Sequence, residues 1–584
     1  MSEIAARSVG GDQVVLETEA PFASRADRAG VAVAADATLY RGAEAVMGSA
    51  ASGILSGYER SGVGFLGRLD GDFAFVLWDT TSRRLLAARD FTGRRSLFYA
   101  FAGERLTVAS TVAGVLRDER VPRTLDLAAI TIAAAGLWGH SSTTAYAAVH
   151  ELPPGHLLEW RPGAPPQVTT FWRPPERIMT RQPPLEGAAA ELRELLVDAV
   201  RVRLAPVGTT AISLSGGWDS TAVLGAGVAS LGPAAHERLR PVSISYPPDD
   251  PGREDDLIEE VARHTGVATR WIEVDSISLF EGVAERAAQR DLPFAHAFEA
   301  WNRRLARDAR AAGASVILDG AGGDQLFQVS DIYLSDLFAR GRWLELARQW
   351  KGRGGRGARN FWRWAVRPGL PTALTTLLAR MRGMEPPPHH LDRQPPFWFV
   401  PRFLESHAVL ERERRAAPVL PGSSRVLAES HAYLRYAYFG RVLAQLHRFA
   451  REEGVESRSP LLDSRVVAFA AQRPWSERAN GPETKLLLRR AMRGLLPDRV
   501  LAPRARRTGV TSAYFLRQLR GPGRAAVTEM LNDSRLADVG MIDLPRLRRA
   551  WEHVLAHDDD EMGIRIYFTL QAEFWLRSHE ERAG

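Results

Sequence analysis

The stretch that decides the fold of this chain is Thr210-Ala211-Ile212-Ser213-Leu214-Ser215-Gly216-Gly217-Trp218-Asp219-Ser220. Its first five residues form a short apolar run typical of a buried strand, and residues 221–229 after it have helical periodicity. Apolar runs at 242–246 and 315–318 repeat the strand pattern, with helical segments between them. Strands that alternate with helices in this way predict an open parallel sheet, and therefore an α/β fold.

The loop inside this stretch has the chemistry of a phosphate site. Gly216 and Gly217 let the backbone come close to a phosphate, and the following helix offers free N–H groups and the positive end of its dipole. Ser215 and Ser220 add hydroxyl donors, and the carboxylate of Asp219 is a ligand that suits Mg²⁺. In an open parallel sheet, ligands bind at the carboxyl ends of the strands. We therefore expect these five residues to hold the pyrophosphate part of a nucleotide.

Residues 215–220 resemble the SGGxDS loop of the asparagine synthetase family, and ordered similarity covers roughly residues 210–510. Residues 318–327 resemble the second signature of that family, from which Asp324 is carried over as a magnesium ligand. Residues 454–463 and 485–497 resemble two later segments. The resemblance implies ATP and Mg²⁺ as cofactors, activation of a carboxylate as an acyl-adenylate with release of pyrophosphate, and attack by an amine.

The first 180 residues have a different pattern. Short, mostly apolar runs separated by Gly-containing turns are typical of antiparallel sheet, and they lie at 72–79, 85–90, 96–100 and 106–109. Residues 69–75 and 88–90 also resemble the glutaminase domain of the same family. That resemblance implies an antiparallel β-sandwich with helices.

A proline-rich, polar stretch that reaches Pro184 marks the best domain boundary. We expect a degenerate glutaminase-like domain at 1–180 and an ATP-pyrophosphatase domain at 181–584, which ends in a mainly helical part. A basic, tryptophan-rich insertion lies at about 341–403. It is either a surface that binds peptides or anions, or a set of amphipathic helices whose tryptophans pack on the core; we favour the second interpretation.

Composition excludes several classes of site. The chain has no cysteine, which excludes disulfides, zinc–thiolate sites and a cysteine nucleophile. No uncharged apolar run of about 18 residues is present, and the first residues have no apolar signal core, so we expect no membrane span and a cytoplasmic enzyme. The net charge of +7 comes from 76 basic residues, of which only Lys351 and Lys485 are lysines. This skew reflects base composition more than a nucleic-acid partner.

Three further residues are candidates for catalysis. Lys485 is a lysine where arginine is otherwise the rule, which suggests a need for a compact ammonium near the phosphates or the adenylate; the alternative is an ordinary lysine on a helix surface. Arg507 stands where the family often has a lysine that stabilises the adenylate step. Glu456 either orients groups at the site or is a structural ion-pair residue.

Three positions depart from the family pattern. Glutaminases of this family need a cysteine at position 2, where this chain has Ser2, and their Asn-Gly oxyanion pair appears here as Asp36-Ala37. We therefore expect the front domain to be inactive as a glutaminase. Ala321 replaces a Glu of asparagine synthetases, or a Tyr of β-lactam synthetases, that positions or deprotonates the amine, and alanine can do neither.

These departures suggest that the attacking amine belongs to the substrate itself. The resemblance is closest in character to lasso-peptide macrolactam synthetases, which adenylate an Asp or Glu side chain of a core peptide and close an isopeptide ring with its N-terminal amine. It implies a core peptide as substrate and a leader peptidase and a leader-binding protein as partners. A β-lactam synthetase or another small-molecule amide ligase, and a non-catalytic scaffold, are the alternatives.

Overall fold

A computed structural model describes the chain apart from 1–3, 11–12, 20–22, 43–44, 46–47, 180–182, 353–356, 371–373, 375–376, 378–380, 382–392, 421, 423, 481–482, 505–508 and 584. Ser2 and Arg507 therefore lie outside the described residues, as does the predicted domain boundary between residues 180 and 181.

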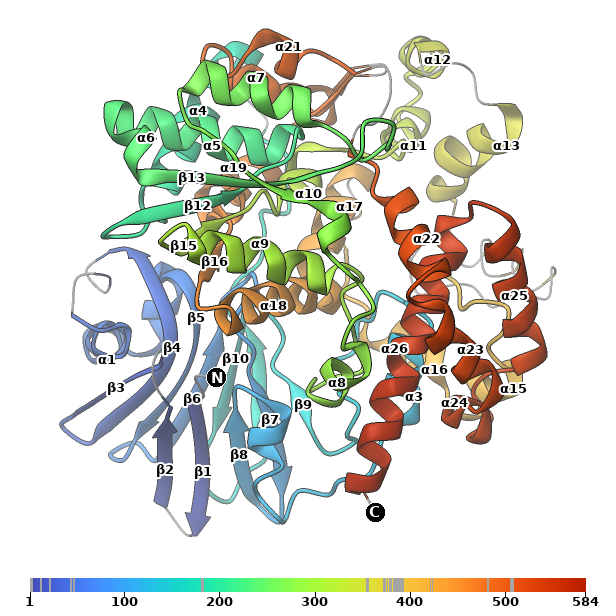
Figure 1. Cartoon of the computed structure of the whole chain (residues 1–584). Helices are drawn as coiled ribbons and strands as arrows, with labels where there is room; N and C mark the ends of the chain where they lie inside the picture. Colours follow the sequence, from blue (N-terminus) through green and yellow to red (C-terminus); the bar gives the residue numbers. More distant parts are fainter. Residues whose placement is uncertain are drawn as a thin grey trace.

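The front half is a sandwich of two antiparallel sheets, as predicted (Figure 1). One sheet has the order β2-β1-β8-β7-β9 and the other β11-β10-β6-β5-β4-β3. The strands are β1 (Ile4–Gly10), β2 (Gln13–Thr18), β3 (Ala23–Arg28), β4 (Val31–Arg41), β5 (Asp70–Asp79), β6 (Arg84–Arg89), β7 (Phe98–Ala102), β8 (Arg105–Ala109), β9 (His150–Glu151), β10 (His156–Trp160) and β11 (Gln167–Thr170).

Strand β5 shows why a strand of this half has apolar residues on both faces. Val76 on one face belongs to a cluster between the two sheets, together with Ile4 of β1. Phe75 on the other face packs with Ile54 of helix α1 (Ala50–Ser61), which covers the outside of the second sheet. Because both faces of β5 are covered, its apolar residues do not alternate with polar ones.

The rear half contains the predicted open parallel sheet, in the order β14-β13-β12-β15-β16. Every pairing in it is parallel. The strands are β12 (Thr209–Ser213), β13 (Leu239–Ser245), β14 (Arg270–Glu273), β15 (Ala314–Leu318) and β16 (Glu456–Arg458). Strand β12 pairs with β13 on one side and with β15 on the other, so the strand order reverses at β12. In open parallel sheets, ligands bind at such a point of reversal.

Helices cover both faces of this sheet (Figure 1). On β12, Ala211 and Ile212 belong to two different hydrophobic clusters, because neighbouring strand residues point to opposite faces. The cluster around Ile212 includes residues of α4 (Leu185–Arg201) and α5 (Trp218–Leu231), and the cluster around Ala211 includes residues of α9 (Glu299–Ala311).

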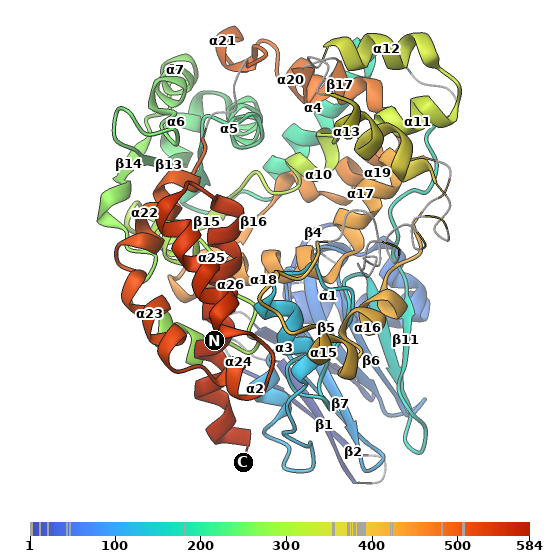
Figure 2. The ribbon, with the colours of Figure 1, turned by 90° about the vertical axis from the view of Figure 1, so that its right-hand side faces the viewer.

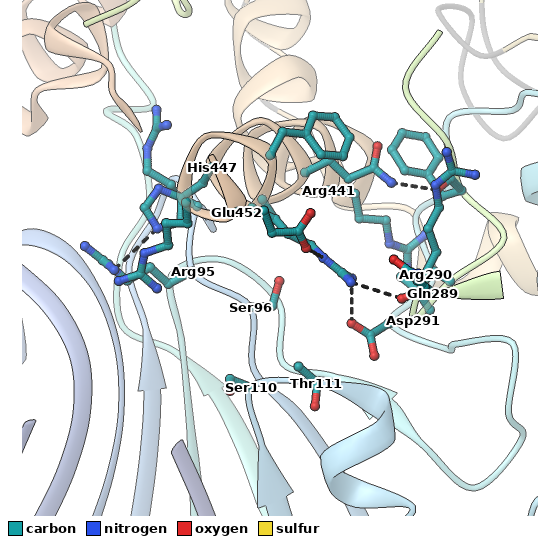
Figure 3. A pocket seen from close by; sticks show the side chains of 18 of the residues that line it. Arg95, Ser96, Ser110, Thr111, Gln289, Arg290, Asp291, Arg441, His447 and Glu452 are labelled. Atoms are coloured by element: carbon teal, nitrogen blue, oxygen red, sulfur yellow. Dashed lines mark hydrogen bonds and ion pairs between the residues drawn. The ribbon is translucent and has the colours of Figure 1, made fainter. Parts of the chain in front are cut away.

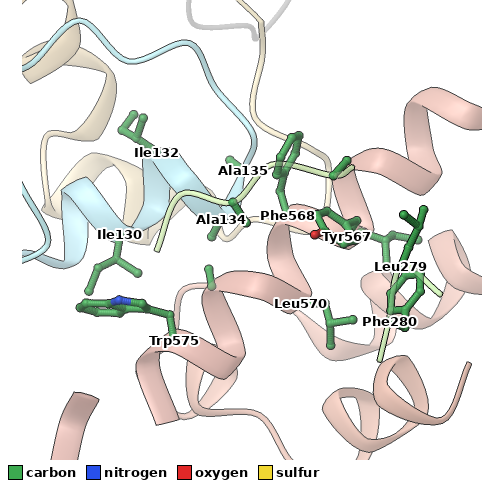
Figure 4. Close-up of a cluster of buried hydrophobic side chains, with 14 of the residues drawn as sticks. Ile130, Ile132, Ala134, Ala135, Leu279, Phe280, Tyr567, Phe568, Leu570 and Trp575 are labelled. Carbon is green, nitrogen blue, oxygen red and sulfur yellow. The ribbon is translucent and has the colours of Figure 1, made fainter. Parts of the chain in front are cut away.

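The last helix ties the end of the chain to the front half. Helix α26 (Asp560–Ala583) packs against α3 (Leu127–Ala134), and Trp575 lies beside Ile130 in their common cluster (Figure 4). The same cluster extends to the parallel sheet through Ala211. One hydrophobic cluster is therefore shared by the two halves, beside further clusters within each half. No described helix is both long and apolar enough to cross a bilayer.

The tryptophans of the tryptophan-rich insertion differ in burial. Trp350 and Trp364 pack against a small cluster that includes Tyr333, and Trp398 is buried in the main core, so the packing interpretation is right for these three. It is wrong for Trp343 and Trp362, which are 56% and 45% exposed. They lie on or next to helices α12 (Trp343–Gly352) and α13 (Gly357–Phe361), at the edge of the molecule (Figure 2).

Candidate functional site

A cavity of about 700 Å³ opens at the carboxyl ends of β12 and β13, the position expected for ligands in this fold. The predicted phosphate loop forms part of its wall. The other parts come from segments far away in the sequence, and the lining includes Ser215, Gly217, Trp218, Asp219, Ser220, Tyr246, Glu254, Trp301, Gly320, Asp324, Gln328, Lys485, Arg504 and Gly509. No described residue of the tryptophan-rich insertion lines it.

The loop is closed by its own serines. The Ser220 hydroxyl accepts from the Ser215 N–H (3.0 Å) and donates to the Ser215 carbonyl (3.1 Å), and the two hydroxyls lie 2.9 Å apart. Helix α5 begins at Trp218, three residues before the predicted start, so Asp219 and Ser220 stand on its first turn. The first turn of a helix has backbone N–H groups without helical partners, which favours an anion at this point.

Two carboxylates and one ammonium meet at the floor of the cavity. Lys485 Nζ lies 2.5 Å from Asp219 Oδ2 and 2.6 Å from Asp324 Oδ1. Burial raises the pKa of Asp219 to about 6, and the charge of Asp324 acts in the same direction against the opposing charge of Lys485. For Lys485, burial alone would lower the pKa, but the two carboxylates outweigh it and raise the pKa. The three predicted residues are thus brought together by the fold.

The second glycine signature lets Asp219 come this close. A Cβ added to Gly323 would lie 2.1 Å from Asp219 Cγ, and one added to Gly320 would lie 2.9 Å from Asp219 Cβ. Real Cβ atoms do not approach other heavy atoms at such distances, so any side chain at either position would push the two loops apart. The glycines after β15 are therefore needed for contact with the phosphate loop.

These residues fit a magnesium ion shared with a nucleotide. Asp219 Oδ1 is buried and has no hydrogen-bond partner, while Asp324 is largely exposed on the cavity side. Within the described residues, no group of three His, Asp or Glu side chains is placed to hold a metal alone. Mg²⁺ usually takes one or two carboxylates and completes its shell with phosphates and water. Asp219 and Asp324 are the residues that would hold it.

Sequence reasoning missed Glu254 and Arg504. The Glu254 carboxylate accepts from the Gly216 N–H (2.9 Å), and a Cβ on Gly216 would lie 2.8 Å from the Glu254 side chain. Arg504 donates to the Gly216 carbonyl (2.5 Å) and lies 4.9 Å above the ring of Trp218. Because Gly216 has no side chain, Glu254 can come close enough to accept from its N–H. No local motif marks either residue, because each comes from a separate segment.

Glu456 lies apart from this cavity. It begins β16, accepts from Arg95 (2.8 Å), Arg458 (2.9 Å) and the Thr38 hydroxyl (2.6 Å), and does not line the cavity. Burial alone would raise the pKa of Glu456, but the charges of Arg458 and Arg95 lower it strongly. These contacts match the ion-pair interpretation, one of the two that the sequence left open.

A second cavity, of about 550 Å³, lies between the two halves (Figure 3). Strand β1 begins beside it, because the carbonyl of Ile4 accepts from the N–H of Ser110 (3.0 Å), a lining residue. Asp36, at the position of the family's oxyanion pair, also lines it. Both Asp36 oxygens are occupied: Arg95 contacts Oδ1, and Arg451 donates to Oδ1 (2.9 Å) and Oδ2 (2.7 Å).

This second cavity also contains a histidine that stays neutral. Burial, and then the charges of Arg451, Arg95 and Arg94, hold the pKa of His447 well below its usual range. A neutral imidazole does not compensate the negative charge of Asp36, so the arginines alone do so. In these contacts Asp36 joins the front half to helix α18 (Ala437–Glu452), which carries Arg451.

Arg94 connects the front half to the cavity of about 700 Å³, which we call the nucleotide cavity after the ligand that the sequence predicts for it. Its guanidinium donates to Ser457 Oγ (2.9 Å) and contacts the Ser459 hydroxyl, which in turn donates to Asp319. Asp319 also accepts from the N–H of Ala321 (3.0 Å). A buried side chain of the front half thus holds the start of the loop that leads to helix α10 (Gly323–Phe327), which carries Asp324.

Comparisons with known proteins agree with this geometry. A family model described as asparagine synthase matches residues 191–577, and one described as a glutamine amidotransferase domain matches residues 39–172. The amidase chyE of Penicillium rubens is 27% identical over 302 residues, which are 49% of this chain and 44% of that protein. The chain thus spans less than half the length of that relative.

Two longer matches are to asparagine synthetases. Asparagine synthetase 3 of Bacillus subtilis, named as glutamine-hydrolysing, is 22% identical over 74% of this chain and 66% of its own length. A putative asparagine synthetase of Mycobacterium tuberculosis is 26% identical over 77% of this chain and 68% of its own length. The asparagine synthase family model matches most of the rear half, and the glutamine amidotransferase model matches most of the front half. The chain therefore belongs to the asparagine synthase family.

Proposed function

We propose that the chain is an ATP-dependent, amide-forming ligase. The observation that carries this proposal is the meeting of Asp219, Asp324 and Lys485 beside the loop 215–220. Members of the asparagine synthase family form amides with release of AMP and pyrophosphate. In this reaction a substrate carboxylate attacks the α-phosphorus of ATP, pyrophosphate departs, and an amine then displaces AMP from the acyl-adenylate.

The described residues support the first step in distinct ways. The first turn of α5 and the Ser215 hydroxyl would bind the departing pyrophosphate. The Lys485 ammonium would move from its two carboxylates toward the phosphates and offset their growing charge. Asp219 and Asp324 would hold Mg²⁺, which when bound neutralises the phosphate oxygens and orients the leaving group.

The source of the amine decides between members of the family. Asp36 carries a carboxylate, which has no hydrogen to donate to an oxyanion, and both of its oxygens are held by Arg95 and Arg451. Ala321 offers no group that could take a proton. Both features speak against an amine released from glutamine and favour an amine in the substrate. A peptide α-amine, with a pKa of about 8, is partly neutral at physiological pH and needs little help to attack.

We therefore infer a macrolactam synthetase of the lasso-peptide type. It would adenylate an Asp or Glu side chain of a core peptide and join it to the N-terminal amine of the same peptide as an isopeptide bond. What such an enzyme must supply is mainly a shaped space that brings the two ends together. A leader peptidase and a leader-binding protein would prepare the peptide.

A small-molecule amide ligase is the second candidate. Two relatives carry the name amidase, chyE of Penicillium rubens and chry2 of Gibberella zeae, at 27% and 26% identity. The loss of a Tyr at Ala321 counts against β-lactam formation, because closing a strained ring requires more help in deprotonating the nitrogen.

The test is to incubate the chain with ATP, MgCl₂ and the core peptide encoded by a small neighbouring gene. We expect the peptide to lose one water and to release AMP and pyrophosphate in equal amounts, and we expect glutamine to make no difference. Pyrophosphate release only with a small amino acid would favour the second candidate. Amide formation that requires glutamine would contradict both.

A further inference from the structure

The positive charge of the protein is concentrated in one segment. Residues 340–367 contain nine arginines and lysines and a single acidic residue, Glu345, which gives a net charge of +8. The whole chain has a net charge of +7, so the remaining residues are close to neutral. A general excess of arginine, which base composition explains, would not produce this local concentration.

The same segment exposes apolar side chains. Fourteen large hydrophobic side chains are exposed in the described part of the chain, and six of them lie between residues 343 and 381. They include Leu344, 86% exposed, and Met381, 75% exposed, and the others are Trp343, Trp362, Leu374 and Leu377. We call residues 340–381, as far as they are described, the basic apolar surface.

The outward direction of these side chains follows from helical spacing. On α12, Leu344, Arg348 and Lys351 recur at intervals of four and three residues and are all exposed, while Leu346 on the opposite side is buried. Leu374, Leu377 and Met381 repeat this spacing, and the N–H of Met381 donates to the carbonyl of Leu377 (2.9 Å). On α12, apolar and basic groups thus share one outer face.

A separate set of side chains fastens this surface to the body. Leu346, Trp350 and Trp364 pack against the cluster that contains Tyr333 and Trp475. The exposed apolar side chains therefore take no part in the packing that attaches this surface to the body. Because no described residue of this surface lines the nucleotide cavity, its use is distinct from ATP chemistry.

We propose that the basic apolar surface docks on an anionic lipid membrane. Amphipathic helices with Trp and Leu beside Lys and Arg lie in the headgroup region, where apolar side chains enter the acyl boundary and basic ones meet anionic lipids. Exposed leucines and a methionine gain nothing from stacking on nucleic-acid bases, which aromatic side chains favour. The cores of protein interfaces are depleted of charge, whereas here basic groups alternate with apolar ones.

The experiment is co-sedimentation of the full chain with vesicles. We expect binding to vesicles of phosphatidylcholine mixed with phosphatidylglycerol, little binding to phosphatidylcholine alone, and a loss of binding in high salt. The charge variant Arg348→Gln/Lys351→Gln/Arg359→Gln/Arg363→Gln should lower the partition coefficient at least about tenfold. The apolar variant Leu344→Asn/Trp362→Gln should also lower it, with its salt dependence kept.

Matched controls come from other parts of the surface. Arg117→Gln/Arg201→Gln/Arg415→Gln/Arg499→Gln removes four exposed arginines, and Val207→Asn/Val419→Asn removes two exposed apolar groups. Both should bind vesicles as the parent chain does, and all variants should keep its Tm. Equal binding to both vesicle types, no binding to either, or equal losses in the control variants would overturn the proposal. So would tighter binding, sensitive to the same variants, to polyglutamate or single-stranded RNA at the same salt concentration.

Discussion

Two aspartates, one in each half of the molecule, differ in how their carboxylates are used. Asp36 in the front sheet has both oxygens bound by the guanidinium groups of Arg95 and Arg451. Asp219 at the phosphate loop has one oxygen on Lys485, whereas its other oxygen is buried without a partner. An unpaired buried carboxylate oxygen is costly, so it is retained where a ligand completes it.

The contrast supports the assignment of the proposed chemistry to the rear half. A carboxylate fully occupied by arginines is fixed in place and joins two parts of the fold, while one that keeps a free oxygen beside a cavity can accept a metal ion. The front half then contributes indirectly, since Arg94 holds Ser459 and through it Asp319 at the edge of the nucleotide cavity. Substitutions at these two aspartates and at the residues around them test this difference between the two halves.

The largest effect is expected from Asp219→Asn. The amide has no negative charge and is a weaker magnesium ligand than the carboxylate, so ATP-dependent pyrophosphate release should fall by about 10²–10³-fold. Pyrophosphate release and Tm are the measurements, and Asp275→Asn, an aspartate outside the cavity, is the control. Unchanged pyrophosphate release in Asp219→Asn would remove the basis of the proposed function.

A close backbone approach is tested by Gly323→Ala. The added Cβ would lie 2.1 Å from Asp219 Cγ, which forces Asp219 away from Lys485 and should lower the rate by about 10²-fold. Gly67→Ala is the matched control, because a Cβ there meets nothing within 4 Å. If both variants retain full activity, the position of Asp219 is less critical than the distances indicate.

The two lysines of the chain form a natural pair for the next test. Lys485→Arg keeps the charge but replaces a compact ammonium between two carboxylates with a planar guanidinium, so kcat should fall by about tenfold with a smaller change in KM for ATP. Lys351→Arg, on the exposed end of α12, should behave as the parent chain does. Equal activity of Lys485→Arg would show that charge alone is needed.

A smaller effect on activity is expected when Asp36 is changed. Asp36→Asn removes the carboxylate that Arg95 and Arg451 share, which leaves Arg95 only its pair with Glu456, and should lower the free energy of unfolding by about 3 kcal/mol. The activity of the folded fraction should stay the same, and no glutamine hydrolysis should appear. Asp27→Asn, whose exposed pair with Arg25 contributes less than about 1 kcal/mol, is the control in chemical denaturation. A gain of glutaminase activity would contradict the structural role of Asp36.

The smallest effect is a change in the slope of stability with pH. The pKa of Glu456 is lowered in the folded chain, so its ion pairs stabilise the fold fully above its unfolded pKa of about 4.3 and are lost as pH falls below it. The free energy of unfolding should therefore decrease from about pH 5 to pH 3. Glu456→Gln should be less stable at neutral pH and should show a shallower decrease. An unchanged slope would place the acid sensitivity elsewhere.

Local patterns predicted the elements well. The runs at 72–79, 85–90 and 210–214 overlap β5, β6 and β12, because each is an apolar segment bounded by turn residues. The loop 215–220 could also be recognised from the sequence, since its glycines and hydroxyls are adjacent there, and its binding of a phosphate stays a prediction. The predicted start of α5 at residue 221 is three residues too late, because Asp219 and Ser220 of the predicted phosphate loop themselves form its first turn. The exposure of Trp343 and Trp362 was missed because helical spacing does not reveal which face another part of the chain covers.

The sequence by itself determined the two sheet types, the order of the two halves and the loop with its aspartate, since each depends on residues that are neighbours in the chain. Only the tertiary structure decided that Lys485 meets Asp219 across 266 residues, that Glu254 and Arg504 hold Gly216, and that Glu456 pairs with Arg95 across 361 residues. Contacts over such separations depend on how whole elements pack, and no local periodicity encodes them. The predicted phosphate loop can therefore be recognised from the sequence, whereas the residues that contact it from other segments are known only from the tertiary structure.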